Sequence, residues 1–287
     1  MLFIILLLFL LFLALAWVYL ALPQSPPRAM DAFTGRDYAH RGLWTPEGPP
    51  ENSLEAFRLA AEAGFGIELD VQRTADGELV VFHDDSLERM CGLRKPLASC
   101  TLAELKGYSL LDSTQPIPLL AEALQAVGGR VPLIVEIKPG KEIQDICRKT
   151  DALLQRYTGE ACVESFDPRA MRWFRKNRPG RIRGQLAAFP TRRTPRDWNT
   201  RTLLLGMMVC NAFSRPDFVA YKAATDRNPF FRAVRRMGAY TVAWTVRSQE
   251  EMDRLRDRYD IQIFDSFLPA SPTVPEKTDS GLSELAE

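Results

Sequence analysis

The chain has 287 residues, and its 37 basic and 36 acidic side chains almost cancel. This length fits one large α/β domain or two small ones, and the balanced charge gives no electrostatic reason to expect nucleic acid as a partner. The five cysteines form no CxxC pair and no metal-finger spacing. We therefore expect packing residues rather than a zinc site, with a Cys91–Cys100 disulfide left open.

The first predicted element is an apolar transmembrane helix over residues 1–22, which contains no charged side chain. About 20 apolar residues span the hydrocarbon core of a bilayer. Trp17 and Tyr19 lie near its end, where aromatic rings favour the membrane interface. The alternative is a signal peptide cleaved near Ala16 or Ala21, but the missing basic start and the long apolar stretch favour a retained anchor.

Basic residues follow this helix, at Arg28, Arg36 and Arg41. By the positive-inside rule they place the following domain on the cytoplasmic side of the cell membrane, as a single-pass protein. Prolines predict a short stiff linker over residues 23–35. At the other end, residues 269–287 are rich in Pro, Ser, Asp and Glu, which predicts a disordered tail.

Between these ends, strand patterns alternate with helical patterns, which is typical of a parallel sheet with helical crossovers. About eight such units over residues 36–268 favour a closed (β/α)8 TIM-type barrel over a doubly wound sheet, and no GxGxxG motif opens a helix. No final barrel helix is evident. Residues 85–118 exceed a barrel connection, so we expect an inserted lobe with a short helix at 101–106. The predicted strands are 36–40, 66–73, 79–83, 131–138, 162–166, 183–188, 204–210, 240–246 and 261–265. The predicted helices are 53–63, 119–127, 142–156, 168–177, 216–224 and 249–258. We expect Asn52 to be the N-cap of the first of these helices.

The chain has only two histidines, His40 and His83, and both lie next to charged or turn-forming residues. Histidine exchanges protons near neutral pH, so the pair could supply an acid and a base. Between them, Glu68 and Asp70 alternate with apolar residues, so both carboxylates lie on one face of a strand. In an antiparallel sheet that face could be solvent. In a closed barrel it would be the interior, where carboxylates require a cation or hydrogen bonds.

A second alternating pair, Glu136 and Lys138, ends the strand at 131–138. Functional groups of a barrel gather at the carboxyl ends of its strands. With the carboxylates described above, Glu136 gives the hard oxygen ligands that suit Mg²⁺ or Ca²⁺. Arg41 and Lys138 add fixed positive charge that suits a phosphate. The joint placement at strand ends indicates phosphodiester cleavage.

Seven motifs follow one another along the chain: HRG at 40–42, PENSLEAF at 50–57, GIELDV at 66–71, VFHDDSL at 81–87, EIKP at 136–139, SFDP at 165–168 and AWTV at 243–246. In both order and approximate spacing they closely resemble the glycerophosphodiester phosphodiesterase family, and the resemblance covers about residues 37–265. The chain departs from the family at Phe264, where members often carry threonine.

The resemblance implies a (β/α)8 barrel that hydrolyses glycerophosphodiesters to glycerol 3-phosphate and an alcohol with one divalent cation, Mg²⁺ or Ca²⁺. Carried over motif by motif, it implies metal binding by Glu68, Asp70 and Glu136, acid–base catalysis by His40 and His83, and substrate binding by Arg41, Lys138 and Trp244, with Glu51 as an additional site residue. Packing of the barrel is an equally good role for Trp244, and a packing role is favoured for Phe166. Which histidine is the acid stays open.

Three alternatives remain beside this reading. In the first, the substrate is a lysolipid and the enzyme is a lysophospholipase D. In the second, the chemistry is that of a phosphatidylinositol phospholipase C-like phosphodiesterase. A non-catalytic membrane-anchored binding protein is the third, and the complete set of histidines and carboxylates argues against it. The basic residues Arg192, Arg193, Arg196 and Arg201 are either solvated or in contact with anionic lipid headgroups.

Overall fold

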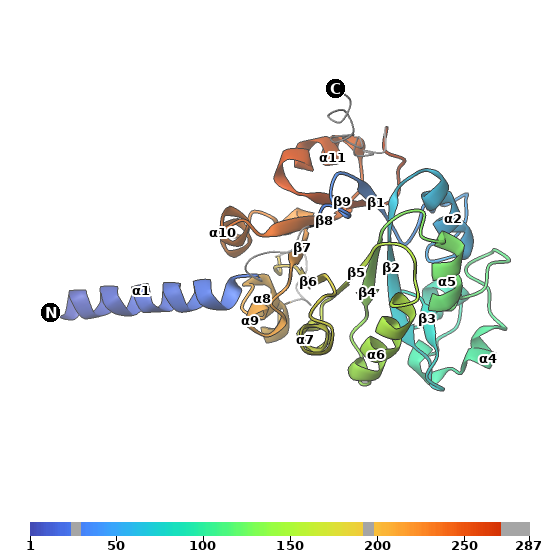
Figure 1. Ribbon diagram of the computed structural model, residues 1–287, viewed down its shortest axis with the longest axis horizontal. Helices are drawn as coiled ribbons and strands as arrows, with labels where there is room; N and C mark the ends of the chain where they lie inside the picture. The colour runs from blue at the N-terminus through green and yellow to red at the C-terminus, as the bar shows by residue number, and fades with distance from the viewer. Residues whose placement is uncertain (24–29, 192–197, 271–287) are drawn as a thin grey trace, which may run out of the picture.

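The computed structural model describes residues 1–23, 30–191 and 198–270, and its centre is a closed barrel of eight parallel strands (Figure 1). The strands of the ring are, in spatial order, β1 (Asp37–His40), β2 (Gly66–Arg73), β4 (Leu133–Ile137), β5 (Ala161–Ser165), β6 (Arg183–Ala187), β7 (Phe218–Lys222), β8 (Tyr240–Val246) and β9 (Ile261–Phe264). β1 pairs with both β2 and β9, which closes the ring. A further strand, β3 (Leu79–Val81), pairs antiparallel with β2. The predicted TIM-type barrel is confirmed.

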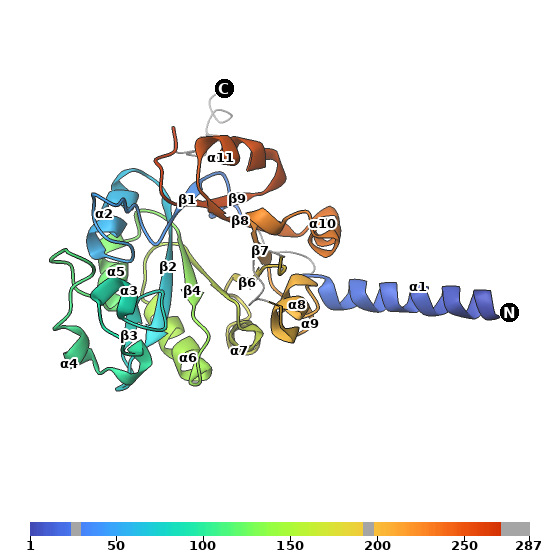
Figure 2. The same ribbon diagram turned by 180° about the vertical axis from the view of Figure 1, so that it is seen from behind.

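Helices lie around the outside of the ring, as both views of the ribbon show (Figures 1 and 2). They are α2 (Leu54–Glu62), α5 (Leu120–Val127), α6 (Ile143–Leu154), α7 (Pro168–Asn177), α8 (Thr200–Gly206), α9 (Asn211–Ser214), α10 (Pro229–Arg236) and α11 (Gln249–Leu255). No helix follows β9 in the described part of the chain, which ends at Ala270, in keeping with the sequence pattern.

Strand periodicity separates an apolar outer layer from a mixed interior. On β2, the outward side chains Ile67 and Leu69 join the core between barrel and helices, while Glu68 and Asp70 point inward. The amino end of the interior is apolar, with Tyr38, Ile134, Phe218 and Ile261 among its members. Met30 and Phe33 pack against the same cluster, and the Tyr38 hydroxyl donates a hydrogen bond to the Phe33 carbonyl (2.9 Å). Polar groups are thereby left to the opposite end.

Two predicted elements between β6 and β8 are wrong. Residues 204–210, predicted as a strand, belong to α8 and the turn after it, and residues 216–224, predicted as a helix, contain β7. Short apolar runs do not distinguish a buried strand from a buried helix. The Asn199 side chain caps α8 by accepting from the Thr202 amide (3.0 Å), and that cap signals a helix start. Helix α10 was not predicted.

The inserted segment after β3 has a small apolar core of its own. It contains α3 (Glu88–Cys91), a 3₁₀ turn at Leu97–Ser99 and α4 (Leu102–Leu105), which confirms the short helix expected at 101–106. Thr101 and Glu104 form a capping box at the start of α4. Its core consists of Val80, Phe82, Leu87, Met90, Leu97, Cys100, Leu105, Leu110 and Ile117. Cys91 and Cys100 are free thiols, like the other three cysteines.

A single helix, α1 (Leu2–Ala21), projects away from the side of the barrel that carries α8, α9 and α10 (Figures 1 and 2). By its length and composition α1 is able to cross a membrane, and a signal sequence near an N-terminus meets the same criteria. The remaining expectations for the linker at 24–29, for the tail at 271–287, and for Arg192, Arg193 and Arg196 lie outside the described residues.

Because the barrel is closely packed, we expect one added methyl group to lower its stability. A Cβ built on Gly184 in β6 would lie 2.1 Å from Cε2 of the fully buried Phe218 ring. We expect Gly184→Ala to lower the free energy of unfolding by about 1–3 kcal/mol, the usual cost of overpacking. Chemical denaturation of the full chain in detergent measures this.

The matched control is Gly180→Ala, because a Cβ at Gly180 meets no atom within 4 Å. We expect it to change stability by less than about 0.5 kcal/mol. Equal stability of the two variants would contradict the close contact between β6 and β7.

Candidate active site

The candidate active site is a cavity of about 280 Å³ at the carboxyl ends of the barrel strands. Every strand of the ring contributes to its wall, through His40, Glu68, Glu136, Glu164, Leu186, Lys222, Trp244 and Ile263. Arg41 and His83 also line it. Asp70, Lys138 and Glu51, the other residues predicted from the sequence, connect to this wall through ion pairs and hydrogen bonds.

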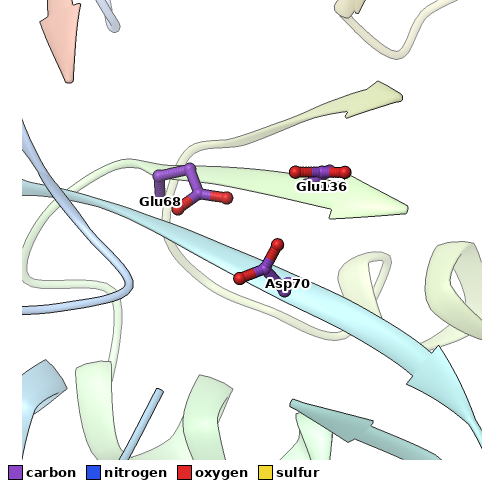
Figure 3. A group of neighbouring side chains, drawn as sticks. All are labelled: Glu68, Asp70 and Glu136. Carbon is purple, nitrogen blue, oxygen red and sulfur yellow. The ribbon is translucent and has the colours of Figure 1, made fainter. Parts of the chain in front are cut away.

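Three carboxylates converge in the mouth of the barrel, as Figure 3 shows for Glu68 and Asp70 on β2 and Glu136 on β4. One oxygen from each lies within 4.8 Å of the others, and all three side chains are buried. Because Ca²⁺–oxygen bonds are about 2.3–2.6 Å long and Mg²⁺ bonds somewhat shorter, one ion can contact all three groups. The donors are hard oxygens throughout, so the residues fit a hard divalent cation.

The electrostatics of this cluster also favour a cation. Burial and the neighbouring Asp70 and Glu136 carboxyls raise the pKa of Glu68 well above its usual value. Burial raises the pKa of Glu136 to about 7, against the opposing effect of Lys138. The pKa of Asp70 is lowered instead, because Lys138 and Arg41 outweigh its burial. Like charges at this spacing cannot all ionise without compensation, and a divalent cation would supply it.

Two cations reach the same cluster from different strands. Arg41 follows β1 in a left-handed conformation (φ 63°), and its Nε lies 3.4 Å from the Asp70 carboxylate. Lys138 follows β4, and its Nζ lies 3.3 Å from Asp70 and 3.1 Å from Glu136. Both side chains are largely buried, so their charges act in a medium of low dielectric constant. Both charges would attract an anionic phosphoryl group at the cavity.

Glu51 holds arginines in place at the edge of the site. Its carboxylate accepts hydrogen bonds from Arg41 (2.7 Å) and from Arg89 of the inserted lobe (2.7 and 2.8 Å). These contacts lower the pKa of Glu51 in spite of its burial. Glu51 therefore fixes the direction of Arg41 and connects the lobe to the barrel.

Asn52 belongs to the candidate site through a contact that the sequence pattern does not predict. We expected it to cap the helix at 53–63, but Ser53 does so, accepting from the Ala56 amide (3.2 Å). The Asn52 side chain, with φ 57° at its backbone, instead donates to Asp70 (2.9 Å). Asn52 therefore orients the buried Asp70 carboxylate, and the neighbouring Ser53 caps the helix.

His40, at the end of β1, is held by Asp265 just after β9. The two side chains are joined between Nδ1 and Oδ2 at 3.0 Å. Hydrogen bonds and nearby cations lower the pKa of Asp265 in spite of its partial burial, so it is an ionised acceptor and Nδ1 carries the proton. Nε2 then lies toward the cavity, 3.9 Å from Glu68. Burial lowers the pKa of His40 although Asp265 opposes the effect.

His83, just after β3, has an equivalent partner in the next residue. Its Nδ1 lies 2.7 Å from the Asp84 carboxylate, which Arg89 also contacts. These partners lower the pKa of Asp84 against its partial burial, so Nδ1 of His83 is again the donor and Nε2 is left to exchange a proton. Burial lowers the pKa of His83 as well. The two histidines therefore have the same arrangement in different elements.

Glu164 on β5 was not predicted. It is fully buried, lines the cavity beside Glu136, its register partner on β4, and its Oε2 has no hydrogen-bond partner among the described residues. Burial and the negative neighbours raise its pKa well above the usual value. The sequence signal for its inward direction is its alternation with Cys162 and Phe166, which also face inward.

An aromatic wall closes one side of the cavity. The Phe166 and Trp244 rings meet edge to face with centroids 5.5 Å apart, and both line the cavity. Phe166 therefore combines the predicted packing with exposure to the cavity. Phe264 points the other way and packs edge-on against Phe65 of the outer core (4.9 Å), so this departure from the family leaves Asp265 free to hold His40.

Comparison with known proteins agrees with this geometry. A glycerophosphodiester phosphodiesterase of Caldanaerobacter subterraneus is 27% identical over 237 residues, which cover 76% of this chain and 88% of that protein. The human lysophospholipase D GDPD1 is 29% identical over 146 residues, 46% of this chain and 45% of that protein. A phosphodiesterase of Oleispira antarctica, solved with the product sn-glycerol-3-phosphate, shares the fold with a TM-score of 0.68 at 22% identity, over 82% of this chain and 94% of that one.

The family model itself covers most of the barrel. The model of the glycerophosphoryl diester phosphodiesterase family matches residues 40–260, from the first catalytic candidate on β1 almost to the last strand. This range includes both histidines and the three converging carboxylates. The chain belongs to the glycerophosphoryl diester phosphodiesterase family and is a phosphoric diester hydrolase.

Proposed function

We propose that the chain hydrolyses glycerophosphodiesters to glycerol 3-phosphate and an alcohol, using a divalent cation and the two histidines. The observation that supports this most directly is the meeting of Glu68, Asp70 and Glu136 with His40 and His83 at one cavity. Cleavage of a phosphodiester near neutral pH requires neutralised phosphoryl charge, a deprotonated nucleophile and a protonated leaving group. Each requirement has its own side chains here.

Glu68, Asp70 and Glu136 would hold the cation, either Mg²⁺ or Ca²⁺. When bound, it supplies positive charge beside the phosphoryl oxygens and favours the ionised form of its ligands. Arg41 and Lys138 add fixed positive charge, and their contacts with Asp70 hold them beside the same space. Glu51 and Asn52 keep Arg41 and Asp70 in these positions.

The histidines move protons through the nitrogens that face the substrate. One imidazole takes a proton from the nucleophile, which is water or the neighbouring glycerol hydroxyl, the latter giving a cyclic phosphate that water then opens. The other gives a proton to the departing alkoxide. Asp265 and Asp84 hold the rings by Nδ1 and stabilise each imidazolium as it forms.

The aromatic wall suggests where the carbon skeleton of the substrate lies. Trp244 and Phe166 give an apolar surface beside the polar cluster, which suits the glycerol or alcohol part of a phosphodiester. The substrate is a small glycerophosphodiester or a lysolipid. Lysophospholipase D activity is the second candidate, because the apolar helix α1 would keep the barrel near lysolipids and one relative carries that name.

We also propose an organisation for the whole chain. Residues 1–22 form a single transmembrane helix, and residues 36–268 form the catalytic barrel with its lobe at 85–118. The basic residues after α1 favour the cytoplasmic side of the cell membrane for the barrel.

Removal of the divalent cation tests the metal assignment. We expect a chelator to abolish glycerol 3-phosphate release from glycerophosphocholine by the full chain in detergent, and Mg²⁺ or Ca²⁺ to restore it. At fixed metal concentration, Glu136→Gln is expected to lose at least about 10–100-fold in activity, because even indirect supports of a metal site are worth that much. Added metal should recover part of the loss.

Glu160→Gln is the matched control for this change. Glu160 is exposed and precedes β5 at the amino end of the barrel, away from the cavity. It should leave both activity and metal dependence unchanged. Product release that persists in the chelator would contradict a metal-dependent reaction.

The pH dependence identifies the acid and the base. The Asp265 carboxylate raises the pKa of His40, and Asp84 raises that of His83, so replacing either partner by Asn should lower the pKa of its histidine. A base must be neutral and limits the rate on the acid side, whereas an acid must be protonated and limits it on the alkaline side. We expect Asp265→Asn to move one limb of the pH–rate profile to lower pH and Asp84→Asn to move the other.

The limb that each variant moves assigns the role of its histidine. Asp257→Asn, an exposed carboxylate outside the cavity, serves as the control and should move neither limb. If both variants moved the same limb, or neither moved one, the His40–His83 acid–base pair would be wrong.

A further inference from the structure

The last turn of α1 packs as part of the catalytic domain. The Trp17 indole donates a hydrogen bond to the Met207 carbonyl at the end of α8 (2.8 Å), and its ring lies against Phe230 of α10 with centroids 5.4 Å apart. Ala21 is completely buried. The end of α1 therefore lies beside α8 and α9, as both ribbon views show (Figures 1 and 2), and it reaches α10 through Trp17.

Two polar side chains of the domain bind the carbonyl end of this helix. Asn211, which is fully buried, donates to the Ala21 carbonyl (2.7 Å), and Arg215 donates to the carbonyls of Tyr19 (2.9 Å) and Leu22 (3.0 Å). The Arg215 guanidinium also lies 4.9 Å from the centroid of the Tyr19 ring. The last carbonyls of a helix have no partner within it, so these contacts satisfy groups on both sides.

The length of α1 determines how close its docked end lies to the membrane. The helix has 20 residues, and its stretch from Leu2 to Leu15, before the domain begins to cover it, is only about 21 Å long at 1.5 Å per residue. The hydrocarbon core of a bilayer is about 30 Å thick. A helix that crosses this core must therefore use the docked turn as well. The part of the domain that holds this turn then lies at the membrane surface.

The elements next to the docked end of α1 carry side chains that suit such a surface. Tyr19 of α1, Leu204 of α8 and Phe213 of α9 are 67%, 42% and 56% exposed. Arginines accompany them: Arg172 lies 5.9 Å from the centroid of the Phe213 ring, and Arg201 of α8 is exposed. Aromatic rings favour the membrane interface, and basic side chains are attracted to anionic headgroups.

We propose that α1 is a rigid stem rather than a flexible tether, and that the wall formed by α8, α9 and the start of α10 rests in the headgroup layer of an anionic phospholipid bilayer. This inference rests on the proposed membrane anchoring of α1 and is independent of the proposed chemistry. The stem fixes one side of the barrel against the lipid surface. The predicted linker begins only after the docked end of the helix.

Fluorescence quenching by brominated lipid tests the position of this wall. The full chain carrying Phe213→Trp is reconstituted in phosphatidylcholine–phosphatidylglycerol vesicles, with or without bromine on acyl carbons near the headgroup. The signal of the parent chain is subtracted. We expect the added indole to lose fluorescence in the brominated vesicles.

Leu111→Trp is the matched control, because Leu111 is 54% exposed and belongs to the loop between α4 and α5. These two helices lie on the side of the barrel away from α1 (Figure 1). Its indole should keep its fluorescence. Quenching at neither position would overturn the proposal, since the domain would stand clear of the bilayer. Equal quenching at both would also overturn it, since no fixed face would meet the lipid. The measurement uses no substrate, so failure of the proposed function leaves its outcome unchanged.

A second comparison tests the rigidity of the stem. Asn211→Ala with Arg215→Ala, added to Phe213→Trp, removes the polar contacts to α1 and should reduce the quenching, while turnover of soluble glycerophosphocholine stays at the level of the parent chain. Where near-UV circular dichroism shows that the double change prevents folding, Arg215→Ala alone serves, because Arg215 lies partly at the surface. Undiminished quenching in a folded variant would contradict a stem held by these residues.

Discussion

The burial of like charges in the mouth of the barrel is the constraint on which the site depends. Asp70 is completely buried and is contacted from three directions, by Arg41, Lys138 and the Asn52 carboxamide. These partners come from the ends of β1 and β4 and from the turn before α2. An isolated carboxylate in such a place would be costly, so the backbone accepts left-handed conformations at Arg41 and Asn52 to bring the partners in. The convergence of Glu68, Asp70 and Glu136 follows from that compensation.

The two histidines show how one chemical arrangement arises from unlike parts of the chain. His40 and Asp265 are brought together only by closure of the ring between β1 and β9. His83 and Asp84 are neighbours in the sequence, and Arg89 of the inserted lobe holds that carboxylate. One imidazole therefore depends on the whole barrel, and the other depends on a local turn and the lobe. The lobe is part of the site through this contact and through Glu51.

The barrel and the convergence of Glu68, Asp70 and Glu136 could be predicted from the sequence, because strand periodicity assigns these carboxylates to one face. The sequence was insufficient where local signals compete. The apolar run at 204–210 fits a strand or a buried helix. Because of this ambiguity, a strand was predicted there and a helix was predicted at 216–224, where the structure has β7. Asn52 has the propensity of a helix cap but binds Asp70, a contact that only the closed fold creates. Glu164 lies in a run with Cys162 and Ser165, and its inward direction becomes evident once β5 is placed beside β4.

The docked end of α1 also orders events during synthesis. The contacts of Trp17 with Met207 and of Asn211 with Ala21 each join residues 190 positions apart. A chain made from its amino end delivers the apolar helix long before its receptors on α8 and α9 exist. The last carbonyl groups of α1 therefore bind water or lipid headgroups until most of the barrel has been synthesised. A segment that is made early is thus among the last to reach its final contacts, and completion of the barrel coincides with its attachment to α1.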